Sequence, residues 1–149
     1  MWKQFFVLLA FFLNACATTS LPATIQADIG EEFTLTPSQS VAISESDLTM
    51  TLLSVPTDGR CPLDIECTES GPITVVVTVQ FSSGAAQELV FQTFTDDSGN
   101  VPEMDFQGMQ TSIEIGDIVI YVSKVLPFPR TFSTEIKPAE YLVSFLVTK

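Results

Sequence analysis

Short runs of alternating hydrophobic and polar residues follow one another from about residue 32 to the C-terminus. In the clearest run, the apolar side chains of Ile73, Val75, Val77, Val79 and Phe81 fall on one face of a β-strand. Similar runs, separated by Gly, Pro, Asp and Ser, predict further strands at 33–36, 40–44, 47–55, 88–94, 110–115, 118–125 and 141–148. We therefore expect an all-β fold of about seven or eight antiparallel strands, either a β-sandwich or, alternatively, a small barrel.

Two breaks in this pattern carry specific predictions. Gly116-Asp117 separates two strand candidates and suits a two-residue type II′ turn, because glycine accepts a positive φ at the first central position. In Leu126-Pro127-Phe128-Pro129, two residues lack a backbone donor. This second segment is expected to be an extended crossover or a sheet edge.

The N-terminal segment has a different pattern. Lys3 precedes an unbroken apolar run at residues 5–13, which is shorter than the roughly 20 residues that a membrane-spanning helix needs. This pattern is typical of a signal peptide and predicts one at residues 1–15. Residues 16–31 are then expected to form a flexible tether, and residues 32–149 the folded domain.

The end of this segment suggests a lipid anchor. Leu13-Asn14-Ala15-Cys16 resembles the lipobox of bacterial lipoproteins, in which the cysteine is acylated and becomes the first residue of the mature chain. Cys16 is therefore the expected lipidation site of a membrane-anchored protein of the cell envelope. The alternative is ordinary cleavage after Ala17, which would release a soluble secreted or periplasmic protein.

The chain has three cysteines, and lipidation of Cys16 leaves one pair, Cys61 and Cys67. An exported protein reaches a compartment that permits disulfides, so we expect these two to be bonded. Such a short loop would add about 2 kcal/mol to stability. The alternative is two buried free thiols.

Charge and composition exclude several functions. Eighteen acidic residues stand against six basic ones, for a net charge of −12, so nucleic acid and anionic lipid surfaces are poor partners. The chain has no histidine. Ser-His-Asp triads, Cys-His pairs and histidine-based metal sites are therefore excluded.

The remaining candidate chemistry involves carboxylates. One stretch holds several that, with loop carbonyls, could ligate calcium, although their spacing does not match an EF-hand loop: Asp58, Asp64, Glu66 and Glu69. A solvated acidic loop is the interpretation we favour for these residues, and the same holds for Asp96 and Asp97. Asp97-Ser98-Gly99 matches the core of an aspartic protease motif, but Asp-Ser-Gly-Asn is also a good turn sequence, which we prefer.

Three further residues stand out. Arg60 lies beside Cys61 among the acidic residues, and its forked donors suit a structural pin that bridges Asp58 or loop carbonyls. Phe128 and Phe132 lie near prolines and off the alternating pattern. We expect these two to be surface aromatics and therefore contact points.

The loop also resembles a known family, the small exported bacterial lipoproteins of unknown function with an Asp-Ser-Arg-Cys-Pro segment followed by Cys-x-Trp-x-Gly. The matching residues here are Asp58-Gly59-Arg60-Cys61-Pro62 and Cys67-Thr68-Glu69-Ser70-Gly71, with Gly59 in place of the serine and Glu69 in place of the tryptophan. The resemblance implies export, a Cys61–Cys67 disulfide and a β-sandwich. It implies no activity.

Together these features predict an envelope lipoprotein that acts as a non-catalytic binding or structural module, without a cofactor. Its expected partners are membrane lipid, through acylated Cys16, and an envelope protein or polymer. One alternative is a calcium-binding or calcium-stabilised secreted domain. Another is a hydrolase that uses only carboxylates, as glycosidases do with two acids about 5 to 10 Å apart.

Overall fold

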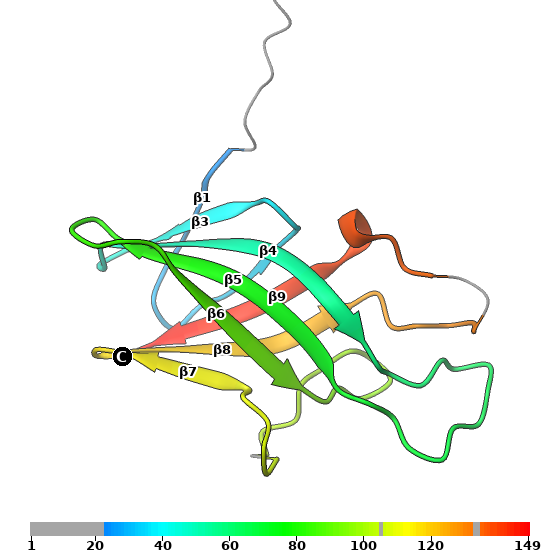
Figure 1. Cartoon of the computed structure of the whole chain (residues 1–149). Coiled ribbons are helices and arrows are strands. Elements are labelled where there is room, and N and C mark those ends of the chain that lie inside the picture. Colours follow the sequence, from blue (N-terminus) through cyan, green and yellow to red (C-terminus); the bar gives the residue numbers. More distant parts are fainter. Residues whose placement is uncertain (1–22, 105, 133–134) are drawn as a thin grey trace, which may run out of the picture.

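Figure 1 shows a computed structural model that describes residues 23–104, 106–132 and 135–149. Within these ranges the protein is an all-β sandwich of two sheets, which confirms the expected fold class, and the sheets are not closed into a barrel. The predicted signal peptide at 1–15 and the lipidation site Cys16 lie outside the described residues.

In the described residues the two sheets contain five and four strands, one or two more than the seven or eight strands expected in all. The five-stranded sheet has the order β1 (Ile25–Ala27), β3 (Ser40–Ile43), β4 (Leu48–Asp58), β5 (Ile73–Phe81), β6 (Gln87–Thr93). The four-stranded sheet has the order β2 (Glu32–Leu35), β9 (Leu142–Thr148), β8 (Ile118–Leu126), β7 (Ser112–Ile115). A short 3-10 helix, η1 (Pro138–Glu140), precedes β9.

The core lies between the sheets and follows the alternation in the sequence. Along β5, the residues from Ile73 to Val79 alternate strictly between buried and partly exposed positions. Phe145 of β9 joins the layers, because its ring centroid lies 6.0 Å from that of Phe33 and 6.2 Å from that of Phe91, on the opposite sheet. Burial of these side chains provides the main driving force for folding.

The folded part begins earlier than expected, which corrects the predicted tether at 16–31. β1 lies within that range and pairs in parallel with β3, with Ile25 opposite Val41. Ile29 and the apolar residues of β1 pack against the core, and Gly30 donates a backbone hydrogen bond of 2.8 Å to Val147. A three-residue strand is too short to produce a recognisable alternation, so its sequence resembles a linker.

The β7–β8 hairpin confirms the predicted two-residue turn. Ile115 pairs with Ile118, and between them Gly116 has a φ of 64°. β7 starts at Ser112, two residues later than expected, because Gln110 instead makes an isolated bridge to Gln92 at the edge of β6. This turn lies at the opposite end of β8 from Leu126 (Figure 1).

Candidate functional site

The β4–β5 connection, residues 59–72, is called the braced loop below. It lies at the same end of the sandwich as the β8–β9 connection, residues 127–141 (Figure 1). Backbone hydrogen bonds join the two connections, from Leu63 to Pro129 at 3.1 Å and from Asp64 to Arg130 at 3.0 Å. The two sheets are therefore linked at this end by paired loops as well as by the core.

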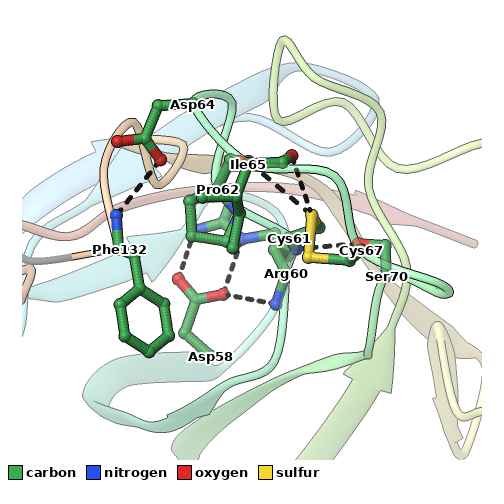
Figure 2. The surroundings of a disulfide bond; sticks show 9 residues. All are labelled: Asp58, Arg60, Cys61, Pro62, Asp64, Ile65, Cys67, Ser70 and Phe132. Atoms are coloured by element: carbon green, nitrogen blue, oxygen red, sulfur yellow. Dashed lines mark hydrogen bonds and ion pairs between the residues drawn. A yellow bond between two sulfur atoms is a disulfide. The ribbon is translucent and has the colours of Figure 1, made fainter.

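A disulfide closes the tip of the braced loop. Cys61 and Cys67 are bonded, with their Cα atoms 6.0 Å apart, which confirms the predicted pair (Figure 2). The Cys61 amide also donates to the Ser70 hydroxyl at 3.1 Å. The loop is thus fixed by covalent and polar contacts rather than by a regular strand.

Arg60 is the centre of the polar contacts below this tip. Its side chain has no exposed area, and its Nε donates to Asp58 Oδ1 at 2.8 Å. Nη2 forms an ion pair with Asp58 Oδ2 (Figure 2). The guanidinium also donates to the carbonyl of Val125 at 2.8 Å and to that of Pro127 at 2.9 Å. Contacts to Asp58 and to loop carbonyls are those predicted for Arg60 as a structural pin. They connect the loop after β4 to the end of β8.

Tyr141 completes this cluster. Its hydroxyl donates to Asp58 Oδ2 at 3.1 Å, and the residue is 5% exposed. Burial, together with the nearby Asp58 carboxylate, raises the pKa of Tyr141 well above its ordinary value. Tyr141 was expected in the last strand rather than at the site, because no signal in the sequence connects it with a carboxylate 83 residues away.

The expectation that Phe128 is a surface aromatic is wrong. Phe128 is only 8% exposed, and the guanidinium carbon of Arg60 lies 4.9 Å from the centroid of its ring. Arg60 binds the carbonyls of Val125 and Pro127, and this fixes the cation over the ring as a cation–π pair. An irregular segment gives no alternation from which this burial could be inferred.

Phe132 is exposed, at 80%, as expected. Two large apolar side chains of the braced loop are also exposed, Leu63 at 50% and Ile65 at 40%. Asp64 lies between them in sequence and accepts the backbone N–H of Phe132 at 3.2 Å, as Figure 2 shows. Leu63, Ile65 and Phe132 are called the apolar rim below. The two aliphatic members were not predicted as contact residues, because they lie in a stretch dominated by acidic residues.

Phe132 of the apolar rim lines a groove of about 570 Å³. Its walls come from the end of β4, the braced loop and the β8–β9 connection, and they include Phe132, Glu135 and Tyr141. Four of its lining residues are prolines: Pro56, Pro62, Pro129 and Pro138. Proline has no backbone N–H, so these four residues donate no backbone hydrogen bonds, whereas the hydroxyl-bearing Ser54 and Thr131 also line the groove.

The structure does not gather the four carboxylates proposed as calcium ligands. Asp58 binds Arg60 and Tyr141, and Asp64 binds the Phe132 amide, whereas Glu66 and Glu69 are exposed. In the ranges that the structure describes, no group of three or more acidic or cysteine side chains could hold a metal ion.

Asp97-Ser98-Gly99 forms a turn. Asp96, the residue before it, accepts the backbone N–H groups of Ser98 at 2.9 Å and Asn100 at 2.8 Å. The hydrogen bonds with Asn100 keep the pKa of the Asp96 carboxyl below its ordinary value. Gly99 has a φ of 80° and packs so closely on β8 that a Cβ would lie 2.4 Å from the Val125 carbonyl oxygen. Asp97 and Ser98 are exposed members of this turn.

Comparisons with models of protein families, with curated proteins and with solved structures find no match to this chain. Among the described residues, no helix is long and apolar enough to cross a membrane. The site is therefore interpreted from its own geometry.

Proposed function

We propose that the chain is an exported bacterial lipoprotein, acylated at Cys16, whose β-sandwich is a non-catalytic binding module of the cell envelope. The residues before the sandwich support export and anchoring, because an apolar run ends in a lipobox-like Leu-Asn-Ala-Cys. β1, the first strand in the described residues, begins at Ile25, nine positions after Cys16.

The apolar rim is the observation that supports a binding role. Three large apolar side chains lie exposed on two loops whose backbones are paired with each other. Exposed apolar patches of this kind mark interaction sites, and a preordered surface loses little conformational freedom on binding.

The polar cluster beneath the rim supports a structural rather than a chemical role for its charged groups. Asp58 accepts hydrogen bonds from Arg60 and Tyr141, and each guanidinium nitrogen of Arg60 already donates. We therefore assign this cluster to holding the rim in place.

Two experiments in a bacterial host test the proposal. First, Cys16→Ser is expected to move the chain from the membrane fraction to the soluble exported fraction, and unchanged membrane association would contradict the lipid anchor. Second, a photoreactive phenylalanine analogue at position 132 is expected to give discrete crosslinked adducts. The same analogue in place of Val90, an exposed residue of β6, is the control. Equal adducts at both positions, or none at 132, would contradict a binding surface at the rim.

A further inference from the structure

The cationic and phenolic donors that line the groove are already used within the protein. Arg60 has no exposed side-chain area, and the Tyr141 hydroxyl proton is directed at Asp58. The four lining prolines add no N–H groups. Glu135, by contrast, is exposed and lines the groove. Among the described lining residues, the groove therefore offers an anionic ligand no free cationic group, whereas the exposed Glu135 carboxylate can pair with a cationic ligand.

The exposed charges of the two connections also favour a cationic partner. On the braced loop and the β8–β9 connection, the described exposed carboxylates outnumber the exposed cations: Asp64, Glu66, Glu69, Glu135 and Glu140 against Arg130 and Lys137. The whole chain carries a net charge of −12. Such a field attracts cationic partners and repels anionic surfaces such as acidic lipid headgroups.

The rim adds a specific contact for a cation. The Phe132 ring is 80% exposed on a backbone fixed by the Asp64 carboxylate, and it lines the same groove as Glu135. An aromatic face near a carboxylate suits an arginine or lysine side chain, which stacks on the ring and pairs with the acid. The protein already uses this pairing internally, where Arg60 covers Phe128.

We infer that the groove and the apolar rim bind a basic segment of a partner protein, with an Arg or Lys side chain between Phe132 and Glu135. Neighbouring apolar side chains of the segment pack on Leu63 and Ile65. This inference rests on the proposed function, because it names the partner of that binding module. The four lining prolines have no N–H groups for pairing with an added strand, so the partner binds mainly through its side chains.

A displayed library of random dodecapeptides, selected on the full exported chain carrying Cys16→Ser, tests the inference. Recovered peptides are expected to combine Lys or Arg with Leu or aromatic residues. Binding of the strongest peptide is then measured by fluorescence anisotropy. Phe132→Ser and Glu135→Gln are each expected to weaken binding about three- to fivefold, the loss of one exposed cation–π contact or ion pair.

Matched controls separate a specific site from general charge attraction. Asp117→Asn removes the same charge as Glu135→Gln but at the far end of β8, and Val90→Ser removes an exposed apolar side chain from β6. Both controls are expected to leave binding unchanged, and melting curves check that every variant is folded. Equal weakening by Asp117→Asn and Glu135→Gln would overturn the inference, as would the recovery of only neutral or acidic peptides or of none.

Binding of a lipid membrane at this surface, in place of a protein segment, would be a separate result. Cosedimentation of the Cys16→Ser chain with phosphatidylglycerol vesicles, lost in Phe132→Ser, would replace the basic segment with a lipid surface and overturn the inference. The binding module itself is tested independently by the crosslinks from position 132. If those crosslinks form and the selected basic peptide does not compete with them, the inference fails and the proposed function stands.

Discussion

Replacing Arg60 with leucine should lower the free energy of unfolding by about 3 to 5 kcal/mol, the cost of leaving one member of a buried ion pair without its partner. The change removes two hydrogen bonds to the Asp58 carboxylate, which is 11% exposed, and two to the carbonyls of Val125 and Pro127. Tyr141 and the residue 60 amide would remain as donors to Asp58, which is why we do not expect complete unfolding.

The assay is urea and thermal unfolding followed by far-UV circular dichroism. For a domain of this size, the loss corresponds to a melting temperature about 10 to 20 °C lower. Arg130→Leu is the matched control, because Arg130 is exposed, and its effect should stay within about 0.5 kcal/mol. Arg60→Lys should fall between Arg60→Leu and the wild type, since a lysine keeps the charge but cannot form the forked contacts.

A double variant examines the cause of the loss. Asp58→Asn combined with Arg60→Leu should be more stable than Arg60→Leu alone, because it removes the unpaired carboxylate. If Arg60→Leu costs less than about 1 kcal/mol, or no more than Arg130→Leu, then Arg60 is not the pin that joins the two sheets.

Three further predictions concern stability. Gly99→Ala should lower the free energy of unfolding in urea by about 1 to 3 kcal/mol more than Gly108→Ala. Both glycines have a positive φ, but only at Gly99 would the added methyl clash with the backbone of Val125, so equal losses would contradict this reasoning. Reduction of the Cys61–Cys67 disulfide should lower the free energy of unfolding by about 2 kcal/mol, as the urea midpoint with and without reductant would show, and an unchanged midpoint would count against a bracing role. Because burial raises the pKa of Tyr141 above that of the unfolded chain, its contribution is complete below pH ~10 and is lost as the pH rises beyond that value. Tyr141→Phe should therefore flatten the alkaline fall in melting temperature, and an identical fall in both proteins would refute the coupling.

Much of the fold could be predicted because it is encoded in local alternation. β5 matches its predicted range, and β8 differs from its own by a single residue at the end. β1 could not be predicted, because three residues carry no period and its partner β3 is joined through non-local parallel pairing.

The candidate site could likewise be predicted only in part. Arg60 and the Cys61–Cys67 pair could be recognised because each stands out by residue type against the sequence around it. Their distant partners could not, since Tyr141 and the carbonyl of Val125 come from segments that the sequence assigned to ordinary strands. Phe128 was misplaced for a related reason, because its burial depends on a cation that is remote in sequence.

β1 has a practical consequence for handling this protein. Its backbone occupies one edge of β3, where Ala27 also accepts the amide of Ser44 at 2.8 Å. A recombinant chain starting at Glu32, the domain boundary that the sequence suggested, would leave that edge with unpaired donors and acceptors. Such an edge is a template for strand exchange between molecules, so the shortened chain should self-associate, whereas a chain starting at Ala23 should remain dispersed.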